Sequence, residues 1–199
     1  MRHWVTSDFH LGHSNIIRYC NRPWLKEGDL NSKGYWVSEE IATARLKEMN
    51  ETIINNFNSM IKEDDMVIHN GDFVFKNSPG GKLGEGTTTR AYDYIKQLNG
   101  MWTFIMGNHD KQNSLKTKIL NLTFKFGNYK FFIVHNPEHA NLNYDINLCG
   151  HVHEKWKIKR KENTILYNVG VDVNQFKPVS FEKIIVDIER WKKLNEPTV

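Results

Sequence analysis

The stretch Thr103-Phe104-Ile105-Met106-Gly107-Asn108-His109-Asp110 decides the fold of this chain. Its first half is a short apolar run, which predicts a buried strand. Its second half places an amide, an imidazole and a carboxylate in a tight loop directly after that strand. Polar side chains at the end of a core strand are typical of a functional site that a rigid frame holds in place.

The same pattern recurs at four other places, where a short apolar run is followed at once by Asp or His. The runs and their loops are 4–6 before Ser7-Asp8-Phe9-His10, 66–68 before His69-Asn70-Gly71-Asp72, 131–134 before His135-Asn136, and 146–149 before Gly150-His151-Val152-His153. In open α/β sheets, ligands bind outside the carboxyl ends of the strands. The five strand ends therefore predict one shared site.

Composition narrows the class of protein. A length of 199 residues with 39% hydrophobic side chains predicts a single domain over residues 1–199 with a substantial core. The formal net charge of +4 allows an anionic substrate, but it is far below the clustered positive charge of nucleic-acid-binding proteins. Cys20 and Cys149 are too few for a disulfide framework. No signal peptide or membrane-length apolar run is evident, so we expect a cytoplasmic protein with no membrane partner.

The predicted elements alternate between strand and helix up to Asp110 and are mostly strands after it. We expect a long helix after the N-cap Ser38 and shorter helices near 15–19 and 88–98. Gly127-Asn128 predicts a hairpin, and further strands are expected at 146–149, 156–159, 165–169 and 184–188. The four glycines within 77–86 predict a flexible loop. An α/β fold follows, with two packed sheets and helices outside them.

Seven side chains at the strand ends carry metal-binding donors: Asp8, His10, Asp72, Asn108, His135, His151 and His153. The set contains no Cys and is too large for a four-coordinate structural zinc site. It suits two divalent ions of the Mn, Fe, Zn or Ni type that share a bridging carboxylate and activate water for attack on phosphorus. His109, beside them, is placed to act as a general acid. Each motif alone is commonplace in turns and on surfaces, whereas their joint occurrence favours a site.

The ordered series Asp8-Phe9-His10, Gly71-Asp72, Gly107-Asn108-His109-Asp110, His135 and Gly150-His151-Val152-His153 resembles the calcineurin-like metallophosphoesterase superfamily over most of the chain. The surrounding sequence is similar to that of small bacterial and phage phosphoesterases. The resemblance implies an αββα sandwich of two mixed sheets flanked by helices. It also implies roles for the seven donors: Asp8, His10 and His153 on one metal, Asn108, His135 and His151 on the other, and Asp72 between them. His109 would then protonate the leaving group.

The sequence departs from the protein Ser/Thr phosphatases of this superfamily, which carry Asp-Arg-Gly after the bridging Asp. Here that stretch is Phe73-Val74-Phe75-Lys76, so both the carboxylate that orients the general acid and the arginine that binds phosphate are missing from it. Asp110 either orients His109 or serves the turn. Arg22 either replaces the missing arginine or lies in an exposed salt bridge. His13 either contacts substrate or is an ordinary polar loop residue. Residues 168–172 are expected to contact the metal-binding loops and hold them in place without binding metal themselves.

These residues predict a metal-dependent phosphoesterase that hydrolyses a P–O bond in a small phosphate ester, with a phosphodiester of nucleotide type as the first choice. A phosphomonoesterase and a nuclease acting on nucleic acid are the alternatives within the same chemistry. A non-catalytic binding scaffold is the alternative from another class, and the presence of every expected ligand and of His109 argues against it. The sequence does not indicate an oligomeric state.

Overall fold

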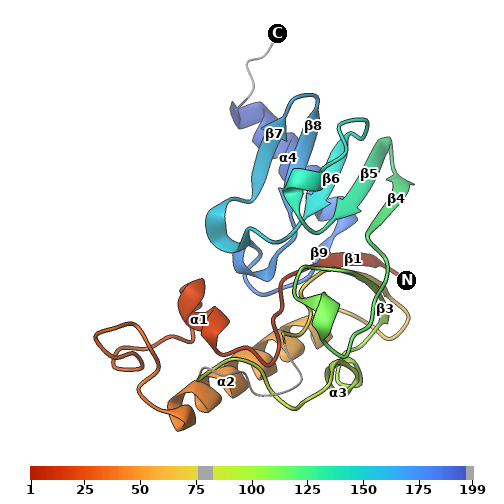
Figure 1. Cartoon of the computed structure of the whole chain (residues 1–199). Coiled ribbons are helices and arrows are strands. Elements are labelled where there is room, and N and C mark those ends of the chain that lie inside the picture. Colours follow the sequence, from red (N-terminus) through yellow and green to blue (C-terminus); the bar gives the residue numbers. More distant parts are fainter. Residues whose placement is uncertain (76–82, 196–199) are drawn as a thin grey trace.

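The computed structural model describes residues 1–75 and 83–195 (Figure 1). Its helices are α1 (Asn15–Tyr19), α2 (Glu39–Asn58), α3 (Ala91–Ile95) and α4 (Phe181–Asn195). The first sheet has the strand order β3-β2-β1-β9, with β1 (His3–Thr6), β2 (Met66–Asn70), β3 (Met101–Ile105) and β9 (Val179–Ser180). The second has the order β4-β5-β6-β8-β7, with β4 (Asn121–Phe126), β5 (Tyr129–Val134), β6 (Ile146–Cys149), β7 (Ile158–Lys161) and β8 (Thr164–Asn168). The predicted α/β class with two mixed sheets is confirmed.

Parallel pairing brings the functional loops to one place. Strands β1, β2 and β3 run parallel, as do β5, β6 and β8, while β9, β4 and β7 pair antiparallel at the margins. A parallel bridge between Ser7 and Gly170 joins the carboxyl end of β1 to the segment after β8. The carboxyl ends of both parallel sets therefore open onto the same region, where ligand sites of α/β sheets form.

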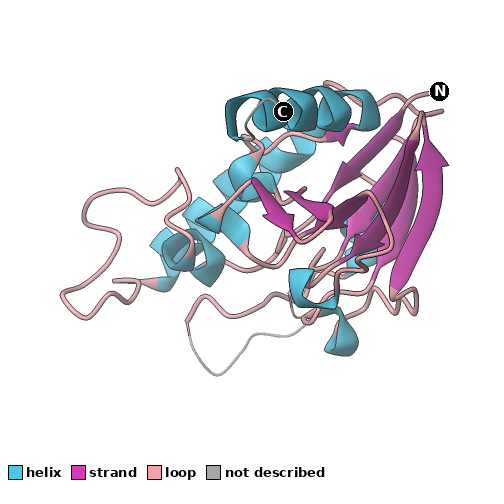
Figure 2. Cartoon of the chain, turned by 90° about the horizontal axis from the view of Figure 1, so that it is seen from above, coloured by secondary structure: helices cyan, strands magenta, loops and turns pink. Residues whose placement is uncertain are grey.

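The first sheet has an apolar core on each of its faces, because successive side chains of β1 point to opposite sides. Trp4 packs with Met49 and Phe57 of α2 on one face. Val5 packs on the other face with Phe131 of the second sheet and Ile184 of α4. Figure 1 accordingly shows the first sheet between α2 and the second sheet, and the view from above shows the helices beside the strands (Figure 2).

Local signals placed several elements correctly. The Ser38 hydroxyl caps α2 by accepting a hydrogen bond from the Ile41 N–H at 3.3 Å. The hairpin of β4 and β5 turns at Gly127, which has a φ of +57°. These outcomes confirm the predicted long helix and the predicted hairpin, since both depend on contacts between near neighbours in the sequence.

Other boundaries differ from the predictions. The strand expected at 184–188 is wrong, because these residues belong to α4, whose buried Phe181, Ile184 and Ile188 have the spacing of one helix face. The helix expected at 88–98 is limited to α3, and the strand expected at 156–159 begins later, at Ile158. The glycine-rich loop predicted at 77–86 lies outside the described residues up to residue 82. Across the described ranges, every helix is too short or too polar to span a membrane.

Candidate metal centre

The seven predicted ligands converge where the carboxyl ends of the two sheets meet. Hydrogen bonds between loops fix their positions. The Asp8 N–H donates to the Gly71 carbonyl at 3.0 Å, and the Val171 N–H donates to the Ser7 carbonyl at 3.2 Å. A third link is the His151 N–H, which donates to the Asp8 carboxylate at 3.0 Å. The first bond joins two loops of the first sheet, and the other two join the loop after β1 to loops of the second sheet.

One group of donors consists of Asp8, His10 and His153, whose ligand atoms all lie within 4.8 Å of one another. A second group consists of Asp72, His135 and His151, with the same mutual reach. The side-chain oxygen of Asn108 joins the second group, 3.1 Å from Nε2 of His135 and 2.9 Å from Nδ1 of His151. This grouping matches the one that the sequence predicts for two metals.

Asp72 lies between the two groups. Its Oδ2 is 3.5 Å from Nε2 of His10 in the first group and 3.3 Å from Nε2 of His135 in the second. A carboxylate in this position is able to serve both groups at once, as the bridging prediction requires. Its other oxygen, Oδ1, accepts a hydrogen bond from the His109 N–H at 2.9 Å and so holds the loop after β3.

The state of His10 shows that the donor set fits a divalent ion. The residue is only 1% exposed, and within the described chain neither ring nitrogen has a hydrogen-bond partner. Burial lowers the pKa of its imidazole well below the usual range, which keeps the ring neutral. Buried polar atoms without partners are costly, and neutral imidazole is the form that binds metals. A divalent cation at this point satisfies both conditions.

The backbone at the ligands is held in an uncommon conformation. Five of the seven have a positive φ: Asp8 at 60°, His10 at 53°, Asp72 at 59°, His151 at 70° and His153 at 47°. Side chains other than glycine rarely adopt this left-handed region, and such residues cluster at functional sites.

Glycine allows the loops to approach each other closely. Gly71 has a φ of +88°, and a Cβ placed there would lie 2.4 Å from Nδ1 of His135. A Cβ at Gly107 would lie 2.1 Å from Oδ1 of Asp72, and one at Gly150 would lie 2.5 Å from Oδ2 of Asp8. No side chain fits in these spaces, so the glycines set the spacing of the ligands.

The opposite charges of Asp72 and His135 in the second group stabilise each other. Burial opposes ionisation of Asp72, but the hydrogen bond with His135 and the charge of that imidazole hold the pKa of the Asp72 carboxyl below the usual range. Burial also opposes the charged form of His135, yet its hydrogen bond to Asp72 and the charge of Asp8 raise the pKa of the imidazole to about 9. The Nδ1 atom of His135 lies 2.7 Å from the Asn70 carbonyl, which turns Nε2 toward the site.

Asp172 orients the ring of His153 through a hydrogen bond. Its Oδ2 lies 2.9 Å from Nδ1 of His153, which leaves Nε2 for the metal side. Burial works against the charged imidazole, but the bond to Asp172 raises the pKa of His153 to about 11. Asn168 donates to the His153 carbonyl at 2.8 Å. These contacts confirm the predicted supporting role of residues 168–172.

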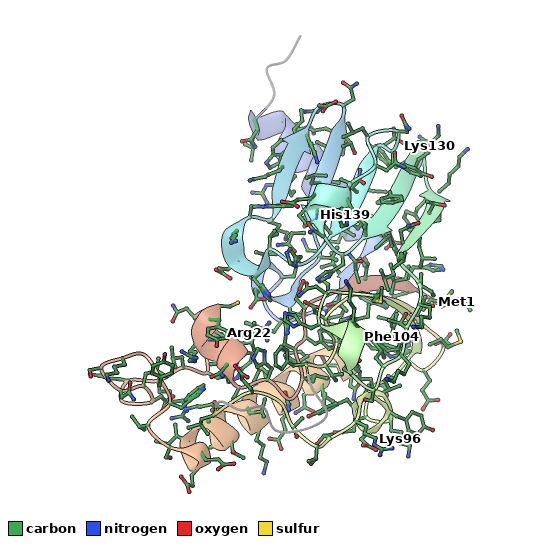
Figure 3. The ribbon with its side chains drawn as sticks, in the orientation of Figure 1. Met1, Arg22, Lys96, Phe104, Lys130 and His139 are labelled. Carbon is green, nitrogen blue, oxygen red and sulfur yellow. The ribbon has the colours of Figure 1, made fainter. Side chains whose placement is uncertain are left out.

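Arg22 forms a salt bridge, the second of its two predicted roles, but the bridge is buried rather than exposed. All five guanidinium N–H groups are used inside the protein: two bind Asp172, at 2.8 and 3.1 Å, and two bind the carbonyls of Phe9 and Asp8, at 3.0 and 2.8 Å. The fifth points to the sulfur of Met49. Arg22 is 2% exposed and lies beside α1 (Figure 3). It therefore connects the first ligand loop to Asp172 and has no donor left for a substrate.

Asp110 does not orient the imidazole of His109. Its Oδ2 accepts hydrogen bonds from the N–H groups of Asp72 and Gly107, at 2.7 and 2.8 Å, and its Oδ1 accepts one from Asn113 at 2.9 Å. The carboxylate instead joins the loop after β2 to the loop after β3. Of the two predicted roles for Asp110, the structural one matches these contacts.

His109 and His13 both lie beside His10. The ring of His109 is half-buried, with its centroid 5.3 Å from that of His10. The ring of His13 is 5.8 Å from His10 and stacks on Phe75 at 3.8 Å. The structure therefore brings both residues to the site, where a general acid and a substrate contact were predicted.

Sequence reasoning missed Cys20. Its thiol lies within 4.8 Å of the ligand atoms of His153 and Asp172. The nearest signal in the sequence is Arg22, two residues later, and its partner Asp172 is separated from it by 150 positions. Only the folded chain brings these residues together.

Comparison with known proteins identifies the family. A family model for the calcineurin-like phosphoesterase superfamily domain matches residues 1–190. The uncharacterized protein MJ1445 of Methanocaldococcus jannaschii is 32% identical over 196 residues, which cover 95% of this chain and 92% of that protein. The family-model match extends across all the predicted ligands.

Two solved structures are also similar. The protein of unknown function AQ665 from Aquifex aeolicus has a TM-score of 0.61 and 20% identity, and the match covers 94% of this chain and 98% of that one. At this identity it shows the fold alone. A structure described as a novel archaeal phosphodiesterase has a TM-score of 0.40 and 18% identity, covering 85% and 84% of the two chains, which is too low to bear on substrate. Together, the donor geometry and the match over residues 1–190 show that the chain belongs to the calcineurin-like phosphoesterase superfamily.

Proposed function

We propose that the chain is a metal-dependent phosphoesterase that hydrolyses a P–O bond, with a phosphodiester as its preferred substrate. The observation that carries the proposal is the position of Asp72 between two donor groups, with the unpartnered nitrogens of buried His10 beside it. Divalent ions in such a site supply Lewis acidity and an activated water for attack on phosphorus.

The chain's own residues divide the remaining work. Asp8, His10 and His153 would hold one ion, and Asn108, His135 and His151 the other, with Asp72 shared. His109 would give a proton from its ring to the leaving oxygen, since its backbone is fixed by Asp72 and its ring lies beside His10. Asp172 and the Asn70 carbonyl keep His153 and His135 aimed at the site.

The charge around the site favours a diester over a monoester. A phosphomonoester brings a dianion, which is usually matched by an additional arginine or lysine. Arg22 has no free donor, and within the described ranges Lys111 is the cation that lines the cavity beside the second donor group. A diester carries a single negative charge, which suits this arrangement.

The test compares hydrolysis of bis-p-nitrophenyl phosphate with that of p-nitrophenyl phosphate, with added Mn²⁺ and with a chelator. We expect metal-dependent diester turnover that falls by ~10²–10⁴-fold in His109→Ala, the usual contribution of a general acid. His3→Ala, which changes a histidine at the opposite end of β1, is the matched control and keeps full activity. Metal content is measured in parallel, with about two Mn²⁺ per chain expected in the wild type and in His109→Ala, and less in Asp72→Asn.

Other results would redirect the assignment. Preference for the monoester would make the protein a phosphatase, and cleavage of oligonucleotides with strong salt dependence would make it a nuclease. Two bound metals without turnover of any of these substrates would refute the enzyme proposal and favour a binding scaffold.

A further inference from the structure

A cavity of about 380 Å³ opens beside the second donor group. Asn108, His135 and His151 form the part of its wall that faces the metals. Its volume lies in the range of pockets that bind small molecules, roughly 300–1,000 Å³. The cavity is therefore large enough for more than a phosphate group.

The rest of the wall is mostly apolar. It includes Met106 after β3, Leu120 before β4, and Phe132 and Val134 of β5. Leu120 is 59% exposed, so its side chain is accessible to a molecule in the cavity. An apolar wall that adjoins a cluster of charged metal ligands is a common arrangement in substrate pockets.

The alternation of β5 explains why this apolar surface exists. Phe131 and Ile133 point into the core between the sheets. Phe132 and Val134 therefore point to the outer face, where they form a separate small cluster with Cys149. These side chains do not join the two sheets, and their small exposed parts, 9% for Phe132 and 7% for Val134, line the cavity.

Two basic side chains, Lys111 and His139, complete the wall. Lys111 follows His109 by two residues and makes no ion pair with any described residue. His139 ends the short turn Pro137–His139 near β6, on the side of the second sheet (Figure 3). The cavity thus combines an apolar wall with a cation close to the metal ligands.

We infer that this cavity holds an organic group of the phosphate ester and selects a flat aromatic group, of the size of a bicyclic ring, over a small alkyl group. The inference rests on the proposed function for the position of the phosphate at the metal ligands. Leu120 and Phe132 would contact the ring, and Lys111 would attract the anionic phosphate independently of the ring. The substrate class is a phosphodiester with at least one aromatic or nucleobase-sized substituent.

The test measures binding, so that it does not depend on turnover. Calorimetry on the Mn²⁺-treated protein compares the monomethyl ester of 1-naphthylphosphonate with that of methylphosphonate, which carry the single negative charge of a phosphodiester and a methoxide that is a poor leaving group. We expect the naphthyl compound to bind at least about tenfold more tightly, because it removes apolar surface from water. Leu120→Asn should lower this ratio by about threefold or more and leave binding of the methylphosphonate ester unchanged. Lys111→Met should weaken both compounds by the same factor.

Leu194→Asn is the matched control, since Leu194 is a 75% exposed leucine on α4 that does not line the cavity. Equal binding of the two phosphonates by the wild type, absence of binding by both, or an unchanged ratio in Leu120→Asn would overturn the inference. Turnover of methyl p-nitrophenyl phosphate separates this failure from failure of the proposed function. Metal-dependent hydrolysis without naphthyl preference leaves the enzyme proposal standing, whereas naphthyl preference without hydrolysis supports the pocket alone.

Discussion

Replacing Arg22 with methionine should destabilise the protein far more than removing a surface arginine. The side chains of Arg22 and Asp172 are 0% and 3% exposed, so the pair is fully buried. Removing one partner of a buried ion pair costs about 3–5 kcal/mol, because it leaves an uncompensated charge inside the protein. In Arg22→Met, the carboxylate of Asp172 loses two donors and keeps only His153 among the described residues, while the carbonyls of Phe9 and Asp8 lose the guanidinium altogether.

The matched control is Arg45→Met. Arg45 makes the same two-point contact with a carboxylate, that of Asp29, at 2.7 and 3.0 Å, but its side chain is 21% exposed and remote from the metal ligands. Water reaches the guanidinium of Arg45 but not the carboxylate of Asp29, whose side chain is 3% exposed, so we expect a loss smaller than that of Arg22→Met, about 1–3 kcal/mol. Urea unfolding of the metal-free proteins, followed by tryptophan fluorescence, gives both free energies of unfolding.

A double-mutant cycle tests the physical reason. If the cost in Arg22→Met comes from the stranded charge of Asp172, adding Asp172→Asn should cost much less than the same change in the wild type. Equal losses in Arg22→Met and Arg45→Met, or additive effects in the cycle, would refute the reasoning.

Three further predictions concern Gly71, the carboxylate of Asp65 and the protons released on metal binding. Gly71→Ala should weaken Mn²⁺ binding and lower the melting temperature more than Gly34→Ala, since both have a positive φ but only Gly71 adjoins His135. Asp65→Asn should lose stability at pH 6 but little near pH 2. Hydrogen bonds from backbone amides lower the pKa of Asp65 from 3.8 to about 2. The contribution of its carboxylate to stability is therefore present above pH 3.8 and lost as the pH falls through about 2. At pH 7.5, Mn²⁺ binding should release about two protons, because the pKa values of His135 and His153 are raised to about 9 and about 11 and only neutral imidazole binds metal.

Each of these has a clear contrary result. Equal effects of the two glycine substitutions would show that backbone strain alone matters at Gly71. A stability difference for Asp65→Asn that persists undiminished to pH 2 would exclude a charge effect. Calorimetry in buffers of different ionisation enthalpy measures proton release, and a value near zero would mean that the two imidazoles are already neutral in the metal-free protein.

The sequence predicted well those features that depend on neighbours along the chain. The cap at Ser38 and the turn at Gly127 each involve residues a few positions apart. The ligand positions were also predictable, because each follows directly on a short apolar strand and parallel strands share an edge. The strand predicted at 184–188 failed because a short apolar run has the same composition in a buried helix as in a strand.

Features that depend on distant pairs were not predictable in this way. Arg22 and Asp172 are 150 positions apart, so the sequence did not show that the guanidinium is fully occupied. The carboxylate of Asp110 was similarly open to two roles until the backbone N–H of Asp72 was placed beside it. The cavity wall at Phe132 depends on which face of β5 meets the other sheet, which a single strand does not determine.

The left-handed backbone at five of the ligands has an evolutionary consequence. Each of these residues costs on the order of 1 kcal/mol or more relative to a relaxed conformation, so the folded chain is strained where it is prepared for metal. Glycine adopts this backbone without strain, and at His10 it would also remove two buried ring nitrogens that have no hydrogen-bond partner among the described residues. Asp8 and Asp72 differ, because their carboxylates accept hydrogen bonds that hold neighbouring loops. Selection for stability alone would therefore act first on His10 and last on the two carboxylates.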